Sequence, residues 1–328
     1  MKTLVTGATG FIGSVLVREL VNENHPVRAL VLEGEDAGRL KDTHVDVWRG
    51  DLEKKETLRG ICDGIDTVFH CAARVTDWGK KKLFYRAILD ATRNLLEESS
   101  NKDVRFVYLS SIAALGLGRH LKGAKETDLP RKSGVPYNDA KADAEKLCLD
   151  YHDKGKVSCT IVRPANVTGP GSVWVRDIIN NMKKMTGVPL VDGGRHSSSF
   201  VYVDSLVEGI IRAGTMETAI GKTYHFRDDW DVTWKQYITD LGAVIGKAPR
   251  GNISFGLAWT IGAAMEATLN PLNLRSPLTR LAAGVTGRNN DVDTLLARSE
   301  LGWETTISYE EAMERIAQWI KAGLQKPG

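Results

Sequence analysis

A tyrosine and a lysine lie four residues apart near the middle of the chain, where they could transfer a proton. Tyr137 and Lys141 follow Pro136, which suits the first turn of a helix, so both side chains share one helical face. The pKa of a free tyrosine is about 10, and a neighbouring ammonium group favours the phenolate that a useful base needs. Because this spacing also arises by chance, a solvent-exposed pair on an amphipathic helix is the alternative interpretation.

Two consecutive serines offer a hydroxyl group for the same chemistry. Ser110 and Ser111 follow the apolar residues 106–109, which are typical of a buried strand. Side chains of adjacent strand residues point to opposite faces of a sheet. Only one of these serines can therefore hold a substrate oxygen beside a proton-transferring tyrosine.

A glycine-rich turn near the N-terminus could place a cofactor at such a site. Leu4 and Val5 lead into Gly7, Gly10 and Gly13, after which apolar residues recur at helical spacing. Glycines permit close approach of a ligand, and the unpaired N–H groups of the following helix attract negative charge. The turn therefore fits a dinucleotide pyrophosphate. A tight turn with only a structural role is the alternative.

The end of the next expected strand, residues 27–32, bears on the choice of dinucleotide. An acidic residue there can bond the adenosine ribose hydroxyls, whereas an arginine favours the 2′-phosphate of NADP. Leu32 stands where that arginine is expected, and Glu33 is the nearest acidic residue. The sequence therefore favours NAD(H), while Arg28 and Arg39 leave NADP(H) open.

A further strand is expected at residues 67–70, and small side chains follow it. Ala72 and Ala73 leave room for a nucleotide at the carboxyl end of a parallel strand. His70 closes the strand, and we expect it to be packed and hydrogen-bonded, without a catalytic role.

Taken in order, these segments resemble the motifs of the extended short-chain dehydrogenase/reductase (SDR) superfamily. Within it, the chain is similar to 3β-hydroxysteroid dehydrogenase-like and dihydroflavonol reductase-like proteins, and the resemblance covers nearly the full length. The matching parts are residues 6–13, Ser111, Tyr137, Lys141, and residues 163–171, 200–204, 277–280 and 297–303.

The resemblance implies an NAD(P)-dependent oxidoreductase in which Tyr137 exchanges a proton with the substrate, Ser111 holds the substrate oxygen and Lys141 also bonds the nicotinamide ribose. The residues expected at the cofactor are Gly7, Gly10, Phe11, Ile12, Gly13, Glu33, Asp51, Leu52, Ala72, Ala73, Tyr137, Lys141, Pro164, Asn166 and Val167. Trp78, Ser111 and Asn166 are expected at the substrate, and no metal is expected.

Two positions modify this expectation. In resembling enzymes an Asp-Leu pair touches the adenine edge, but Asp51 could equally cap the helix that follows it. Ile88 stands where the family usually has an asparagine that bends a helix and supports a proton-relay water. The catalytic group is therefore expected to be a triad of Ser111, Tyr137 and Lys141.

The expected fold class is α/β, with a Rossmann-type doubly wound parallel sheet and a smaller, discontinuous substrate-binding lobe. The NAD(P)-binding domain is expected at residues 1–163, with residues 199–226 returning to it. Residues 164–198 and 227–328 are expected to form the lobe. No flexible linker separates the two parts, so they should pack as one body.

The composition narrows the partners and the compartment. The chain has 328 residues, 42% of them hydrophobic, and a net charge of only +3, which argues against nucleic acid. Its four cysteines show no paired spacing and its histidines show no metal-ligand pattern. Without a signal peptide or a membrane-spanning segment, the sequence predicts a cytoplasmic enzyme with a small-molecule substrate. A homodimer is left open.

The substrate is expected to be a bulky, largely apolar secondary alcohol or ketone. Residues 253–274 are strongly apolar, and with Trp78 they could wall a hydrophobic pocket that opens toward a membrane surface. The alternative is a helix buried against the nucleotide-binding domain. The cluster Lys80, Lys81 and Lys82 is interpreted as a solvated loop.

The sequence also bears on three alternative functions. A nucleotide-sugar epimerase of the same superfamily usually has an arginine for the diphosphate at the position of Ser198, which weakens that alternative. A dehydratase would need an Asp-Glu pair where Ile112 and Ala113 stand. A non-catalytic NAD(P)-binding sensor fits the loss of the asparagine at Ile88 but has no need of the intact triad.

Overall fold

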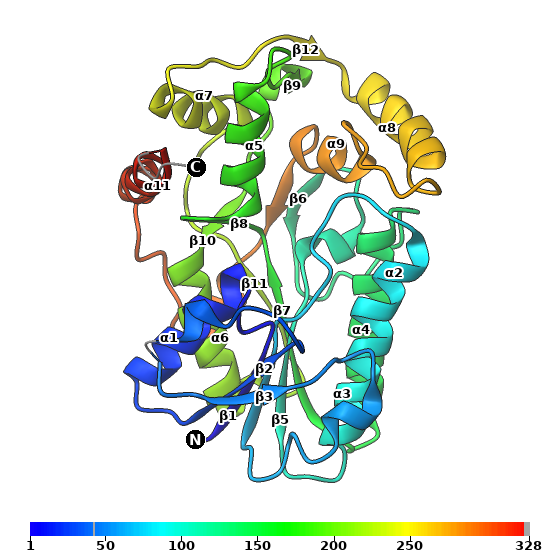
Figure 1. Ribbon diagram of the computed structural model, residues 1–328, viewed down its shortest axis with the longest axis vertical. Coiled ribbons are helices and arrows are strands. Elements are labelled where there is room, and N and C mark those ends of the chain that lie inside the picture. Colours follow the sequence, from blue (N-terminus) through cyan, green and yellow to red (C-terminus); the bar gives the residue numbers. More distant parts are fainter. Residues whose placement is uncertain (42, 325–328) are drawn as a thin grey trace.

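The central element of the computed structural model, which describes residues 1–41 and 43–324, is a seven-stranded parallel sheet (Figure 1). Its strand order is β11-β7-β5-β4-β1-β2-β3, so the winding direction reverses between β1 and β4. Ligands bind outside the carboxyl ends of the strands at such a reversal. The strands are β1 (Thr3–Thr6), β2 (Val27–Val31), β3 (Asp46–Arg49), β4 (Thr67–His70), β5 (Arg105–Leu109), β7 (Ser158–Pro164) and β11 (Thr223–Phe226).

Helices cover both faces of this sheet, because alternate strand residues are apolar on both sides. Val5 packs with the core that includes α1 (Phe11–Asn22) and α6 (Val203–Thr215). Its neighbour Leu4 packs on the opposite side with α3 (Ala91–Ser99) and α4 (Pro136–Asp153), near which the short α2 (Lys81–Tyr85) also lies (Figure 1). The predicted α/β fold with a doubly wound sheet is confirmed.

Shorter elements lie beyond the carboxyl ends of the central strands. Three two-stranded parallel pairs join β6 (Leu121–Ala124) to β13 (Asn290–Val292), β8 (Asn166–Thr168) to β10 (Phe200–Tyr202), and β9 (Leu190–Val191) to β12 (Asn252–Ile253). The remaining helices are α5 (Val173–Lys183), α7 (Trp234–Val244), α8 (Phe255–Leu269), α9 (Arg280–Thr286), α10 (Leu295–Leu301) and α11 (Tyr309–Leu324). The exact division into a nucleotide-binding domain and a lobe stays a prediction.

Helix α8 differs from both expectations for residues 253–274. It lies at the periphery and packs against α9, with only Ala258, Gly262 and Glu266 buried (Figure 1). The helix is apolar on all sides, so its composition gave no sign of which face would be covered. Among the described residues, no helix is long and apolar enough to cross a bilayer.

Candidate active site

The turn between β1 and α1 is built for close backbone approach. A Cβ atom on Gly13 would lie 2.1 Å from the carbonyl oxygen of Gly7, and one on Gly7, whose φ is +65°, would lie 2.9 Å from the amide nitrogen of Ala72. Gly10 begins the helix without a side-chain cap. The turn therefore leaves the helix N-terminus open to an anion such as a dinucleotide pyrophosphate.

A single cavity of about 1540 Å³ connects this turn to the expected catalytic residues. All but one of the residues predicted at the cofactor or the substrate line it. These are Gly7, Gly10, Phe11, Ile12, Gly13, Asp51, Leu52, Ala72, Ala73, Trp78, Ser111, Tyr137, Lys141, Pro164, Asn166 and Val167. Asp51 also accepts a hydrogen bond from the amide of Glu53 at 2.9 Å, so it both borders the cavity and caps the turn after it.

Glu33 is the exception: it is exposed and does not line the cavity. Glu35 lines the cavity instead of Glu33, because the chain turns after β2 and brings Glu35 back toward the glycine turn. The Glu35 carboxylate accepts hydrogen bonds from the Thr9 hydroxyl at 2.7 Å and from the Leu32 amide at 3.3 Å. Counting residues along the sequence could not locate it, since the shape of this turn decides which carboxylate faces the glycines.

The arginines considered for NADP lie outside the cavity lining. Arg28 is held at the start of β2 by Asp46 at 2.8 Å and by the carbonyl of Ile61 at 2.8 Å. Arg39 donates to the carbonyl of Thr9 at 3.2 Å, beside the glycine turn. Arg28 is therefore held away from the cavity, whereas Arg39 lies beside the glycine turn.

Tyr137 and Lys141 lie in the first two turns of α4, which begins at Pro136 as expected. Lys141 is buried, donates to the carbonyl oxygen of Leu109 at 2.5 Å, and has its Nζ 4.7 Å from the ring centre of Tyr108. Burial lowers the pKa of Lys141 to about 8, although Cys71 and Glu145 oppose this change. The lysine therefore keeps most of its charge at neutral pH.

The pKa of Tyr137 differs from the sequence-based expectation. Burial raises it to about 12, and the Ser111 hydroxyl lowers it only in part. The expected lowering by Lys141 is not found in this arrangement, because the ammonium group faces the Leu109 carbonyl and burial dominates. Tyr137 is therefore held as a protonated phenol that can donate to a substrate oxygen.

The two serines at the end of β5 are separated as the strand geometry requires. Ser110 is buried and its hydroxyl donates to the carboxylate of Glu145, inside the protein. Both serines border the cavity, but the Ser111 hydroxyl is not bonded to Glu145, and its oxygen accepts from the amide of Ala113 at 3.1 Å. Ser111 is thus the serine whose hydroxyl proton is available to a ligand.

Sequence reasoning missed Glu145 and Arg163, a fully buried ion pair next to the triad. Arg163 Nη2 lies 2.7 Å from Glu145 Oε2, and its Nε donates to the same carboxylate. Glu145 follows Lys141 by four residues, so it faces the same side of α4. Arg163, a charged residue in the otherwise uncharged strand residues 159–164, was the signal that could have identified the pair, whereas Glu145 lies among other charged residues of α4.

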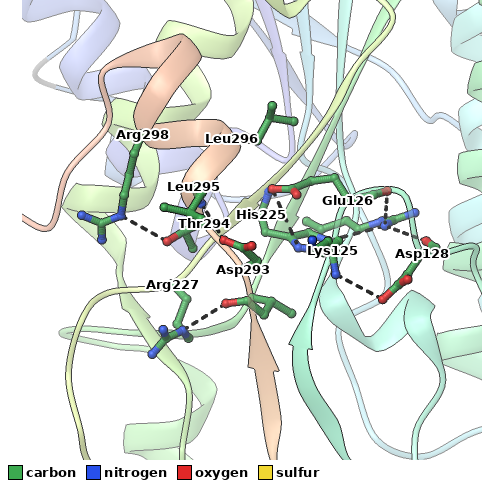
Figure 2. Close-up of polar contacts among 12 residues, drawn as sticks. Lys125, Glu126, Asp128, His225, Arg227, Asp293, Thr294, Leu295, Leu296 and Arg298 are labelled. Carbon is green, nitrogen blue, oxygen red and sulfur yellow. Dashed lines mark hydrogen bonds and ion pairs between the residues drawn. The ribbon is translucent and has the colours of Figure 1, made fainter.

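Arg163 also connects this ion pair to the segment after β6. Its Nη1 donates to the carbonyl oxygens of Glu126 at 3.4 Å and Asp128 at 3.3 Å. Figure 2 shows Glu126 and Asp128 beside His225 of β11, whose amide donates to the Glu126 carboxylate at 3.3 Å. These contacts join the carboxyl ends of β7 and β11 to the segment that follows β6.

Ile88 occupies a widened helical turn, the π-helical residues Arg86–Asp90 between α2 and α3. The helix therefore departs from regular α geometry without the asparagine that usually bends it. The carbonyl of Ile88 accepts from the Thr92 hydroxyl at 2.5 Å, and that hydroxyl also lies 3.0 Å from His70 Nε2. His70 is buried and its Nδ1 lies 2.8 Å from the Thr6 hydroxyl, which confirms its expected packed, hydrogen-bonded state.

Among the described residues, no group of histidine, cysteine, aspartate and glutamate side chains could hold a metal ion. The four cysteines are free thiols.

Comparison with known proteins agrees with this geometry. A relative named 4-hydroxy-2-methyl-3-oxo-4-farnesyl-3,4-dihydroquinoline-1-oxide ketoreductase, from Stigmatella aurantiaca, is 30% identical over 329 residues and covers 98% of each chain. The 2-alkyl-3-oxoalkanoate reductase of Stenotrophomonas maltophilia is 28% identical, covering 96% of this chain and 98% of the relative. A 3 beta-hydroxysteroid dehydrogenase/Delta 5→4-isomerase of Mycobacterium tuberculosis is also 28% identical, covering 95% and 88%.

The fold recurs among solved structures. UDP-glucuronic acid 4-epimerase from Bacillus cereus, in complex with NAD, matches 99% of this chain and 100% of its own with a TM-score of 0.78 and 22% identity. The profile of the NAD dependent epimerase/dehydratase family matches residues 3–226, which include the glycine turn and the Ser111–Tyr137–Lys141 triad. The extended SDR resemblance is confirmed, and the chain belongs to the NAD dependent epimerase/dehydratase family.

Proposed function

We propose that this protein is an NAD(P)-dependent oxidoreductase that interconverts a bulky, largely apolar secondary alcohol and its ketone. The observation that carries this proposal is that Ser111, Tyr137 and Lys141 line the same cavity as the uncapped glycine turn. The names of three relatives, a ketoreductase, a reductase of a 3-oxo compound and a hydroxysteroid dehydrogenase, support the same reaction class.

The proposed proton transfer uses Tyr137 and Ser111. The Ser111 hydroxyl donates to the substrate oxygen and holds it near the phenol of Tyr137. In ketone reduction Tyr137 donates its proton to that oxygen, and in alcohol oxidation the phenolate accepts the proton back. Lys141, which keeps most of its positive charge at neutral pH, is proposed to bond the nicotinamide ribose.

A nicotinamide dinucleotide, when bound, supplies or accepts the hydride in this reaction. The residues that would hold it are those of the glycine turn, the small Ala72 and Ala73, and Asp51 with Leu52 at the adenine end. The fit is supported by the turn itself, since a side chain at Gly7 or Gly13 would fill the space that the backbone needs.

NAD(H) is the proposed form of the cofactor. Glu35 faces the glycine turn through its bond to Thr9, where its negative charge would repel a 2′-phosphate and its oxygens could accept from ribose hydroxyls. The nearby arginines are turned to backbone carbonyls, with Arg39 on Thr9 and Arg49 on Leu32. Glu35 therefore replaces Glu33 in this proposal.

An apolar substrate is supported by the cavity wall beyond the triad. That wall contains Val75, Trp78, Leu117, Trp174, Ile178, Val188, Leu190, Ile238, Leu281 and Val285. Ile253 is the one residue of the stretch 253–274 that reaches it, so the apolar helix α8 no longer forms part of the argument.

The test is turnover measured by the near-ultraviolet absorbance of the reduced nicotinamide, with a panel of apolar ketones and alcohols that includes steroids and long-chain 3-oxo compounds. We expect turnover in the wild-type protein and none in Tyr137→Phe.

An epimerase remains the second candidate because of the shared fold. Ser198, at the position of a diphosphate-binding arginine, donates to the carbonyl of Val232 at 2.8 Å instead of facing the cavity. Thermal stabilisation by UDP-sugars alone, with no turnover of the panel, would replace the oxidoreductase proposal with the epimerase.

A further inference from the structure

Arg74 is an arginine in the cavity wall that has no acidic partner within the described part of the chain. It lies four residues after the end of β4, lines the cavity and is half-buried. Its Nε atom is buried and makes no hydrogen bond, and no carboxylate of residues 1–41 or 43–324 lies within ion-pair distance. Removing a guanidinium from water without a partner is unfavourable, so this position suits an anionic ligand.

The positive charges of the other arginines in the cavity wall are balanced by acidic residues or by solvent. Arg275 Nη2 lies 2.6 Å from Asp177 and 3.7 Å from Asp77. Arg176 is exposed, so solvent can balance its charge. Among the described residues of the cavity wall, Arg74 is thus the arginine that is partly buried and has no acidic partner.

Packing, and not an ion pair, holds the Arg74 side chain. The guanidinium carbon lies 5.5 Å from the ring centre of Phe84, and Nη2 would be 3.1 Å from a Cβ atom on Gly79. Gly79 has a φ of +122°, a conformation that other residues rarely adopt. A larger residue at position 79 would therefore strain the backbone, and its side chain would crowd the Arg74 guanidinium.

The same contacts link Arg74 to the proton donor. Phe84 and Gly79 line a small recess together with Trp78 and Tyr137. Arg74 and Tyr137 therefore line the same large cavity and are linked through Phe84, so an anionic group bound to Arg74 can belong to the substrate that reacts at Tyr137.

We infer that Arg74 binds a carboxylate of the substrate, and that the substrate class is a bulky 3-oxo acid or the corresponding 3-hydroxy acid. In such a compound one carbon separates the carboxylate from the reacting carbon, which suits an arginine and a proton donor that line the same cavity and both adjoin the recess at Phe84. A guanidinium binds a carboxylate through two parallel hydrogen bonds. One arginine suits this single negative charge, whereas the dinucleotide phosphates are expected at the glycine turn.

This inference rests on the proposed oxidoreductase function and keeps its chemistry. The 3-carbonyl group gains two electrons and one hydrogen as hydride at carbon from the reduced nicotinamide, and its oxygen gains the proton of Tyr137. The product is the 3-hydroxy acid and the oxidised nicotinamide. The bond between C2 and the carboxylate is unchanged, so Arg74 contributes binding and orientation only.

The test compares one acid with its neutral ester. A 3-hydroxy acid with a long alkyl branch at C2 and its methyl ester are oxidised by the wild-type protein, Arg74→Met and Arg74→Lys. We expect wild type to prefer the acid, and Arg74→Met to lower kcat/KM for the acid about 10- to 100-fold, mainly through KM. Activity on the ester should stay within about threefold, and Arg74→Lys should recover part of the loss.

Arg59→Met serves as the matched control, because Arg59 is exposed and does not line the cavity. It should leave kcat/KM for both compounds unchanged. Equal losses on acid and ester, or a raised KM for the dinucleotide alone, would overturn the carboxylate assignment while leaving the oxidoreductase proposal intact. Turnover of neither compound, nor of any neutral alcohol or ketone, by wild type would overturn the oxidoreductase proposal and this inference together. Thermal melting of each variant identifies losses that arise from misfolding, and Arg74→Lys then decides the result.

Discussion

The hydroxyl of Ser110 donates a hydrogen bond to the fully buried carboxylate of Glu145, one turn beyond Lys141 on α4. Arg163, near the end of β7, binds the same carboxylate. Glu145 thus joins α4 to two strands whose carboxyl ends border the cavity. Because α4 also carries Tyr137, this contact positions the phenol relative to Ser111 at the end of β5.

Substitution of each serine should separate this structural contact from the chemistry. Ser110→Ala removes a hydrogen bond to a buried carboxylate, which should lower the free energy of unfolding by about 1.5–3 kcal/mol. Ser111→Ala removes only the hydrogen bond from the Ala113 amide, so it should lower the free energy of unfolding less, by about 1 kcal/mol. It should lower kcat by about a hundredfold, the usual loss when one oxygen-binding donor is removed. Denaturant unfolding and steady-state kinetics on both variants check this. A Ser111→Ala enzyme with wild-type kcat would contradict the assignment.

Tyr137→Phe should abolish turnover and leave the dinucleotide Kd within a few-fold of wild type. The phenol acts on the substrate, whereas the proposed role of Lys141 includes the cofactor, so Lys141→Ala should weaken both turnover and dinucleotide binding. Steady-state kinetics and dinucleotide titration measure these two effects. If Tyr137→Phe kept more than about one hundredth of the wild-type kcat, the loss would be smaller than acid–base catalysis usually supplies and another proton donor would be needed.

The central fold followed directly from sequence patterns. Buried parallel strands such as β2 and β4 are short apolar runs. The glycine spacing after β1 predicts a tight turn that leads directly into a helix. Tyr137 and Lys141 were found because helical spacing places them on one face. Patterns that depend on neighbours in the chain were therefore sufficient for these parts.

Features that depend on tertiary structure were not predictable in the same way. The carboxylate facing the glycine turn is Glu35 and not Glu33, because the turn after β2 folds back onto Thr9. Helix α8 is apolar on all sides, so its packing partner α9 could not be read from its sequence. Arg74 lacked any motif, and its meaning comes only from the absence of an acid near it in the described residues.

Acid should destabilise the protein through His70. Burial lowers the pKa of His70 to about 3, whereas the pKa of an unfolded histidine is about 6.5. Between these values the unfolded chain binds one more proton, so the free energy of unfolding falls as the pH drops below about 6.5. The contribution is about 1.4 kcal/mol per pH unit.

His70→Asn should reduce the slope of the free energy of unfolding against pH by about 1.4 kcal/mol per pH unit, the contribution of one proton, because asparagine can hydrogen-bond but does not titrate. His225, whose pKa burial lowers to about 4, acts in the same direction and stays present in the variant. Denaturant unfolding at several pH values from 4.5 to 6.5 measures the two slopes, and equal slopes would show that His70 is not held neutral.

Glu35 should determine the choice between the two dinucleotides. Its carboxylate lies beside Thr9 and the glycine turn, where the adenosine ribose is expected, and it would repel a 2′-phosphate. We expect wild type to have at least a tenfold higher kcat/KM with NAD(H) than with NADP(H). Glu35→Gln keeps the size of the side chain but removes its charge, and the guanidinium groups of Arg39 and Arg49 remain nearby. The variant should therefore gain activity with NADP(H) and narrow the ratio of the two kcat/KM values several-fold.

Glu33→Gln is the matched control, because Glu33 is exposed and outside the cavity, and its ratio should equal that of wild type. A tenfold preference of wild type for NADP(H) would contradict the NAD(H) proposal, and a shift caused by Glu33→Gln instead of Glu35→Gln would return the role to the residue first expected from the sequence.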